Sequence, residues 1–139
     1  MSISIARHAH MLTGQCQCGA VRIAVPDDFN YALYCHCKGC QRSTGSAFKA
    51  FAGIEASKLQ INTPEGGLAS FGDENSWDVR CKNCGSLLYS AVNKGEAAHV
   101  TLGVLDTPPS VRPSRHIYVR EKAPWFVITD GLPQSEEMR

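Results

Sequence analysis

The sequence contains neither a long apolar run nor a marked excess of charge of one sign. No apolar stretch approaches the roughly 20 residues that a membrane-spanning helix needs, and the formal net charge of the 139 residues is only +1. A protein that binds nucleic acid usually carries a strong basic field, which this composition does not supply. We therefore expect neither a membrane nor a nucleic acid among the partners of this protein.

The sequence also lacks a long apolar stripe with the 3.6-residue period of an amphipathic helix. Its 12 glycines and 7 prolines leave room only for short helical turns, which we predict at 39–46 and 54–59. Segments rich in β-branched or aromatic residues predict strands at 20–25, 48–54, 99–104 and 115–119. The length suits one hydrophobic core. These patterns predict a mostly β protein with a single domain over residues 1–139.

The N-terminus shows no continuous apolar stretch behind a basic leader, so we expect no secretory signal and a cytoplasmic location. The chain has 7 cysteines, an odd number, which rules out complete pairing as intramolecular disulfides. Clustered thiols in a reducing compartment are typical of metal binding or catalysis. The cysteines are therefore the first candidates for function.

The cysteines form two pairs and one group of three: Cys16 with Cys18, Cys81 with Cys84, and Cys35 with Cys37 and Cys40. Zinc prefers four tetrahedral ligands, so the two pairs together can complete one structural site. Gly85 follows the second pair, where a glycine takes the positive φ of a zinc-knuckle turn. Three protein thiols with a fourth position left to water or substrate are typical of a catalytic zinc. This division uses every cysteine.

Two other interpretations of the cysteines remain open on spacing alone. Cys37 and Cys40 could share a metal with Cys81 and Cys84 as in a zinc ribbon, although this would leave the remaining three cysteines without a role. Alternatively, some cysteines could be buried core residues, or Cys37-x-x-Cys40 could be a redox pair.

The histidines show no metal-binding pattern of their own. His36 lies between two cysteines, but its side chain points away from them in an extended chain, so we expect it to support the ligands rather than bind the metal. The other four, His8, His10, His99 and His116, have no metal partner three or four residues away and are predicted to be strand or surface residues. Trp125 and Phe126 are predicted to pack in the core from a final strand.

Four motifs, in order, resemble the glutathione-dependent formaldehyde-activating enzyme family, which also includes the centromere protein V type proteins. They are Gly14-Gln15-Cys16-Gln17-Cys18-Gly19, the segment 34–48 around the three cysteines, Arg80-Cys81-Lys82-Asn83-Cys84-Gly85, and the tail 116–133. The resemblance covers about residues 12–134. It implies a single Mss4-like domain of small antiparallel sheets tied by zinc. It also implies a structural zinc on Cys16, Cys18, Cys81 and Cys84 and a catalytic, labile zinc on Cys35, Cys37 and Cys40.

The resemblance further implies a zinc-dependent carbon–sulfur lyase that forms or cleaves S-hydroxymethylglutathione, the adduct of glutathione and formaldehyde. Arg42 and Lys49, and less directly Lys38, are the candidates to bind the glutathione carboxylates, for which arginine offers a bidentate contact. The chain departs from the family at Arg80, where an aromatic residue is usual, and at Gln41, where a basic residue is frequent. The second change reduces the positive charge available to glutathione.

Two further functions are compatible with these residues. One is a non-enzymatic zinc module for protein or chromatin binding, as the centromere-type relatives suggest. The other is a thiol-based metal or redox sensor, in which the three-cysteine site loads and releases zinc.

Overall fold

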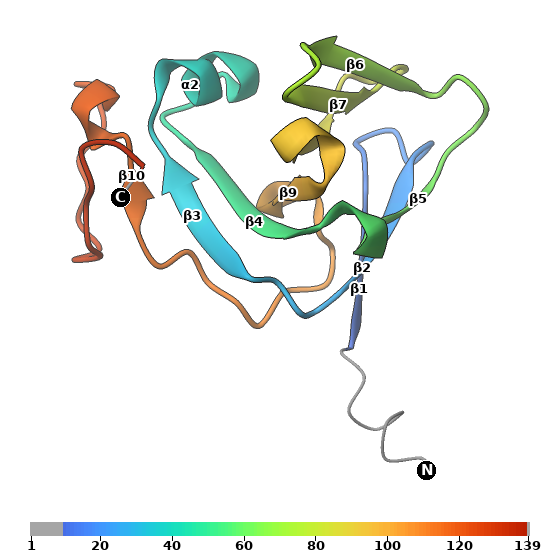
Figure 1. The fold of residues 1–139 in the computed structure, drawn as a ribbon, viewed down its shortest axis with the longest axis horizontal. Coiled ribbons are helices and arrows are strands. Elements are labelled where there is room, and N and C mark those ends of the chain that lie inside the picture. The colour runs from blue at the N-terminus through green and yellow to red at the C-terminus, as the bar shows by residue number, and fades with distance from the viewer. Residues whose placement is uncertain (1–9, 139) are drawn as a thin grey trace.

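The computed structural model describes residues 10–138, in which β-strands dominate (Figure 1). The N-terminal residues 1–9, which include His8 and the segment used to judge a secretory leader, lie outside the described residues. The predicted mostly β fold is confirmed. Among residues 10–138, no helix combines the length and apolar character that crossing a membrane requires.

The smaller of two sheets has three antiparallel strands in the order β1-β2-β5. These strands are β1 Met11–Gln15, β2 Arg22–Pro26 and β5 Gln60–Asn62. Alternate residues of β1 are buried and exposed, because successive side chains of a strand point to opposite faces. One face of this small sheet is therefore available for the core.

The larger sheet has seven strands in the order β10-β3-β4-β9-β8-β7-β6. They are β3 Tyr31–Cys35, β4 Lys49–Glu55, β6 Leu68–Gly72, β7 Trp77–Cys81, β8 Leu87–Val92, β9 Ala97–Thr101 and β10 His116–Ile117. All pairings are antiparallel except the one between β10 and β3, which is parallel. This parallel pairing brings the C-terminal segment beside β3 (Figure 1).

The helices are all short. The only α-helix of the described chain is α2 Lys38–Thr44, and the 3₁₀ turns are η1 Ala56–Lys58, η2 Asn93–Gly95, η3 Leu102–Val104 and η4 Val119–Glu121. The helical turns predicted at 39–46 and 54–59 correspond to α2 and η1. Of the predicted strands, 99–104 turns into η3 after Thr101, and 115–119 ends after two residues because Tyr118 takes a left-handed φ of 57°.

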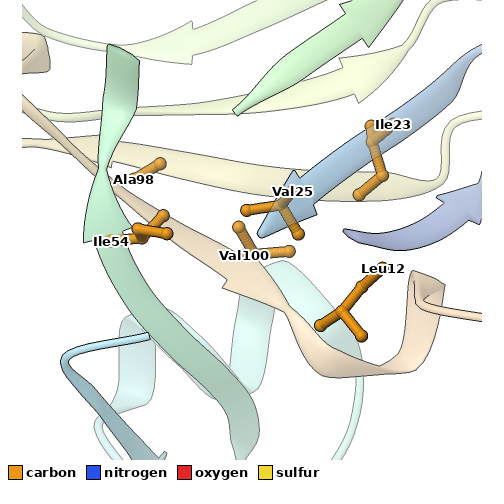
Figure 2. Packing of buried hydrophobic residues seen from close by; sticks show 6 residues of the cluster. All are labelled: Leu12, Ile23, Val25, Ile54, Ala98 and Val100. Carbon is orange, nitrogen blue, oxygen red and sulfur yellow. The ribbon is translucent and has the colours of Figure 1, made fainter. Parts of the chain in front are cut away.

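The main core lies between the two sheets (Figure 2). The small sheet contributes Leu12, Ile23 and Val25, and strands β4 and β9 contribute Ile54, Ala98 and Val100. All six are at least 97% buried, and burial of such side chains contributes about 1.5–3 kcal/mol each for the larger ones. The core therefore covers only one face of the large sheet.

A row of paired residues crosses the opposite face of the large sheet, which we call the groove face. Tyr31 pairs with Gly53, Gly53 with His99, His99 with Ser90, and Ser90 with Asp78. Glycine is needed within this row, because a Cβ at position 53 would lie 2.2 Å from the Tyr31 ring. The Tyr31 ring therefore lies over Gly53, and polar side chains follow it across the strands.

The prediction that Trp125 packs in the core from a final strand is wrong. Its side chain is 70% exposed, and residues 125 and 126 belong to no strand. Phe126 is half-buried and packs against Phe48, with ring centroids 5.3 Å apart. The interior beside this segment is filled instead by Ala123.

Leu12 tests the contact between the two sheets. We expect Leu12→Ala to lower the free energy of unfolding by about 2–5 kcal/mol, because the substitution removes apolar contacts and leaves a cavity. Urea denaturation of the metal-loaded protein measures the change. Val127→Ala is the matched control, since Val127 is 71% exposed, and its effect should stay within about 0.5 kcal/mol. Equal effects of the two substitutions would contradict this account of the core.

Candidate metal centres and the adjoining cavity

Four cysteines from two distant segments meet in one cluster. The sulfur atoms of Cys16, Cys18, Cys81 and Cys84 all lie within 4.8 Å of one another. The Sγ atoms are 3.6 Å apart for Cys16 and Cys18 and 3.8 Å apart for Cys18 and Cys81. A tetrahedral zinc with Zn–S bonds of about 2.3 Å places its sulfur ligands about 3.8 Å apart. The cluster can therefore hold a metal ion, and its dimensions fit zinc.

The two halves of this cluster share one loop design. Gly19 and Gly85 take φ values of 81° and 83°, and each donates its N–H to the carbonyl of the first cysteine in its pair. This turn frees other amides to face sulfur: Val21 N–H donates to Cys16 Sγ at 3.3 Å, and Cys84 N–H to Cys81 Sγ at 3.5 Å. Such donors stabilise a thiolate. The predicted positive φ at Gly85 is confirmed.

Ser86 connects the two loops. Its Oγ accepts a hydrogen bond from the Gln17 N–H at 2.9 Å, and it lies 3.2 Å from Cys84 Sγ, to which it can donate its hydroxyl proton. This hydrogen bond lowers the pKa of Cys84 to about 5. Asn83 Nδ2 donates to Cys18 Sγ at 3.3 Å. Side chains near the metal ligands thus hydrogen-bond to two of the four sulfur atoms.

The other three cysteines form a separate cluster where β3 meets α2. Cys35 ends β3, Cys37 is the N-cap of α2, and Cys40 lies in the first turn of the helix. Their sulfur atoms lie within 4.8 Å of one another. The zinc-ribbon alternative is wrong, because Cys37 and Cys40 group with Cys35 and not with the four-cysteine cluster.

The charge balance of this group favours a cation. Hydrogen bonds from the Cys35 and Cys40 thiols, with that from the Cys40 N–H at 3.3 Å, lower the pKa of Cys37 to about 2. The hydrogen bonds with Cys37 raise the pKa of Cys35 and those with Cys35 and Cys37 raise the pKa of Cys40; burial and repulsion from a neighbouring thiolate add to both shifts. A divalent cation removes this repulsion, so the donor set fits a metal ion with three sulfur ligands.

His36 begins a chain of hydrogen bonds that runs away from the three cysteines. Its side chain is fully buried, and its Nε2 lies 2.7 Å from His116 Nδ1. His116 Nε2 lies in turn 2.8 Å from Asp130 Oδ2. If His116 donates to Asp130, it accepts from His36, and the unpaired His36 Nδ1 carries no proton. Burial, followed by the nearby His116, lowers the pKa of His36 to about 4.

These findings test the predictions for two histidines. His36 belongs to neither cysteine cluster, in agreement with its predicted supporting position. His116 lies in a strand as predicted, but it is 98% buried and not a surface residue. Tyr34 stacks on the His116 ring, and Phe48 and Phe126 pack against His36. The imidazole pair is therefore enclosed by aromatic rings.

Gln41 connects the helix to the C-terminal segment. Its buried Nε2 donates to the carbonyl of His36 at 2.8 Å and to that of Glu121 at 2.9 Å. Lys38 N–H donates to Glu121 Oε1 at 2.7 Å. The glutamine at position 41 therefore has a structural role, because it joins α2 to the C-terminal segment through these two hydrogen bonds.

A cavity of about 420 Å³ opens beside the three cysteines, on the groove face. Lys49 lies in its wall, 95% buried, and its Nζ donates to Ser90 Oγ. Ser90 Oγ donates to Asp78 Oδ1 at 2.6 Å. Burial lowers the pKa of Lys49, and the neighbouring Cys40 and Asp78 oppose that shift. The cavity thus combines sulfur ligands with a buried amine held in a hydrogen-bonded chain.

Only one of the three residues predicted to contact the substrate lines the cavity. Lys49 lines the cavity with the three cysteines, whereas Arg42 and Lys38 are exposed on α2 and do not line it. Ser90 and Asp78 were not predicted, since only the strand register brings them to Lys49.

Arg80 joins the two cysteine clusters. Its guanidinium donates to the carbonyl of Gly85, in the loop of the four-cysteine cluster, at 2.9 Å. It also donates to the carbonyl of Ser43 in α2, the helix that carries Cys40. An aromatic side chain could not make these two bonds, so the departure at this position has a structural role.

His99 lies on the groove face beside the cavity. Its Nε2 is 2.7 Å from the Tyr31 hydroxyl, and its ring stacks on Phe51 with centroids 4.1 Å apart. Burial, with a contribution from Lys49, lowers the pKa of His99 to about 4. The ring is therefore neutral at pH 7.

Comparison with known proteins shows what this chain is similar to. The model of a family described as glutathione-dependent formaldehyde-activating enzyme matches residues 11–121. A relative from Schizosaccharomyces pombe, named an uncharacterized lyase, is 30% identical over 83 residues. The matched region is 60% of this chain and 59% of that relative, so the chain spans less than two thirds of its length. The crystal structure of a Rhodobacter sphaeroides protein is 25% identical with a TM-score of 0.55, covering 73% of this chain and 91% of that one.

The two cysteine clusters predict different responses to substitution. We expect Cys81→Ala to unfold the protein, because a cluster that joins two distant loops loses its metal. Cys37→Ala should keep the native circular dichroism spectrum and lose only the second metal ion. Elemental analysis and circular dichroism on matched samples measure both effects. A folded Cys81→Ala beside an unfolded Cys37→Ala would reverse the assignment.

The lowered pKa of His99 predicts its behaviour in acid. Because the folded pKa of about 4 lies below the ordinary histidine value of 6.5, its contribution to stability is complete above pH 6.5 and is lost as the pH falls toward 4. Two-dimensional NMR of the imidazole nitrogens should show a neutral ring at pH 5.5. A titration midpoint near 6.5 would show that the ring is accessible to water.

Proposed function

Since this chain belongs to the glutathione-dependent formaldehyde-activating enzyme family, we propose that it is a zinc-dependent carbon–sulfur lyase acting on the adduct of glutathione and formaldehyde. One observation carries the proposal: three clustered thiols face a cavity of about 420 Å³ that also contains the buried Lys49. The name of the yeast relative, a lyase, supports the reaction class.

In this proposal the two clusters bind zinc for different purposes. Cys16, Cys18, Cys81 and Cys84 would hold a structural ion with a complete set of ligands. Cys35, Cys37 and Cys40 would hold the catalytic ion, which leaves a position for substrate. Zinc in such a site supplies Lewis-acid chemistry, by lowering the pKa of a thiol and polarising a carbonyl oxygen. A reducing cytoplasm, the proposed location, keeps the seven thiols available.

The proposed reaction is a reversible addition. The glutathione thiol gives up its proton, and its sulfur forms a bond to the carbonyl carbon of formaldehyde while the π electrons of the C=O bond move to oxygen. The oxygen then takes one proton, so the sum of the step moves the thiol proton to the new hydroxyl group. Negative charge therefore develops on oxygen. The Lys49 ammonium would stabilise that charge, because it lies in the wall of the same cavity.

Ser90 and Asp78 would hold Lys49 in position. Ser90 Oγ accepts from Lys49 and donates to Asp78 at 2.6 Å, so a carboxylate stands behind the amine. This arrangement favours the charged form of Lys49 against the cost of its burial. Asp78 and Ser90 are thus positioning residues in the proposal.

The binding of glutathione needs contacts for its two carboxylates. We propose Arg42 for one of them, at the exposed side of α2. Because Arg42 does not line the cavity, this contact requires the tripeptide to extend beyond the cavity mouth. Lys49 would then contact the reacting oxygen and not a carboxylate of glutathione.

Exchange NMR of formaldehyde with glutathione tests the proposal. We expect Lys49→Met to slow the enzyme-dependent exchange by about 100-fold with its metal content unchanged, because the substitution removes one charge-stabilising group. Lys58→Met is the control, since Lys58 lies on the surface in ion pairs with Asp28 and Glu55. Its exchange rate should match that of the wild type.

The same assay with Cys37→Ala distinguishes an enzyme from a non-enzymatic zinc protein. We expect this variant to lose the enzyme-dependent exchange while it keeps its fold. Equal rates in Cys37→Ala and wild type would remove the lyase function and favour a non-enzymatic zinc module or a metal sensor.

A further inference from the structure

A second cavity of about 670 Å³ lies on the groove face next to the cysteine cavity. It is lined by Tyr31, Leu33, Phe51, Val92, Asn93, His99, Arg115 and Met138. Strands β3, β4, β8 and β9 therefore form its floor, and the C-terminal segment contributes to its wall. The proposed reaction of a one-carbon aldehyde makes no use of this cavity.

The two cavities adjoin each other and share part of their walls. Phe51, Val92, His99 and Met138 line both of them. Lys49 and Phe51 lie on the same side of β4, two residues apart, so the strand leads directly from the cysteine cavity into the second one. A ligand whose sulfur lies at the three cysteines can thus extend an attached group along the sheet.

The lining of the second cavity is mainly apolar. Leu33, Phe51, Val92 and Met138 present hydrocarbon, aromatic or thioether surface. His99 adds a neutral ring, since burial keeps its pKa low and the Tyr31 hydroxyl is its partner. The His99 ring and the Tyr31 hydroxyl, two of the polar groups at the edge, are thus partners of each other.

The sheet is shaped to keep this surface open. Tyr31 lies over Gly53, where a Cβ would approach the ring to 2.2 Å. Arg115 is held at the edge by donating to Ser135 Oγ at 2.8 Å. Both large side chains are therefore fixed at the rim, and they do not fill the space above Leu33 and Phe51.

The size of the cavity argues for a substantial occupant. An apolar cavity of about 150 Å³ suffices for a benzene ring, and this one measures about 670 Å³. The hydroxymethyl group from formaldehyde contains a single carbon. An alkyl or aryl group of six or more carbons suits the volume and the apolar lining.

We infer that the second cavity is a subsite for an apolar arm on the substrate, so that this chain acts on thiol adducts of aldehydes larger than formaldehyde. This inference rests on the proposed function for the position of the sulfur and for the reaction. The apolar arm enters beside Phe51 and extends over Leu33 toward Tyr31. The bond changes stay those of the addition described above, with a larger group on the carbonyl carbon.

Binding of stable thioethers tests the inference without catalysis. S-methylglutathione and S-hexylglutathione share every group except the arm, and isothermal titration of the zinc-loaded protein compares them. Each methylene removed from water strengthens binding about fourfold. We expect S-hexylglutathione to bind at least about tenfold more tightly, since the cavity has room for several methylenes.

Substitutions at Leu33 locate the effect. Leu33→Asn, which places an amide in the cavity, should reduce the preference for the hexyl group to about threefold or less, with S-methylglutathione binding unchanged. Leu33→Met is the matched control, because it keeps an apolar side chain of similar volume, and it should retain the preference. Circular dichroism confirms that both variants fold.

The outcomes separate the inference from the proposed function. Equal binding of the two conjugates to the wild type, or a preference that survives Leu33→Asn, would overturn the apolar subsite even if glutathione exchange is catalysed. If neither conjugate binds, ethanethiol and hexanethiol replace them. If hexanethiol then binds more tightly than ethanethiol and Leu33→Asn abolishes the difference, the apolar subsite is supported but glutathione is not the thiol. If the two thiols bind equally, both the subsite and the role of glutathione are overturned.

Discussion

The rest of the structure depends on the closure of the four-cysteine cluster, which joins parts of the chain 63 residues apart. Strands β1 and β2 meet at one loop of this cluster, and β7 and β8 meet at the other. Each sheet is therefore attached to the other at one end by sulfur ligands and along its face by the core of Leu12 and Val100. The main core has six buried members, and the sulfur ligands add a second connection at the end of the sheets. Without the metal ligands, apolar packing alone would have to hold the two sheets together.

One face of the large sheet forms the core, and the other lines the cavities. One face packs on the small sheet, and the other carries Lys49, Phe51, Ser90 and His99. Because side chains alternate along a strand, neighbouring residues have opposite roles. Ile54 belongs to the core, whereas Gly53 is kept small by the Tyr31 ring across the groove face. Changes at adjacent positions of β4 should thus have different consequences, one for folding and the other for ligand binding.

Spacing predicted the parts of the site that are local in the chain. The group of Cys35, Cys37 and Cys40, strand β4 and helix α2 follow from patterns of a few residues. Spacing alone left open which pair joins Cys81 and Cys84, and the structure decides for Cys16 and Cys18. The contacts of His36 with His116, and of Lys49 with Ser90, depend on strand order and register, which no local pattern contains. Short strands such as β5 and β10 are too brief to show alternation. Trp125 was misplaced because its apolar character alone suggested burial.

The chain of hydrogen bonds from His36 through His116 to Asp130 has a consequence for the order of assembly. Every ligand of the four-cysteine cluster has been synthesised once Cys84 is made. The support of the three-cysteine cluster is complete only when Asp130, near the end of the described chain, has been added. As the ribosome releases the protein from its N-terminus onward, the structural centre can close first. The three clustered thiols gain their full support only after the scaffold around them exists.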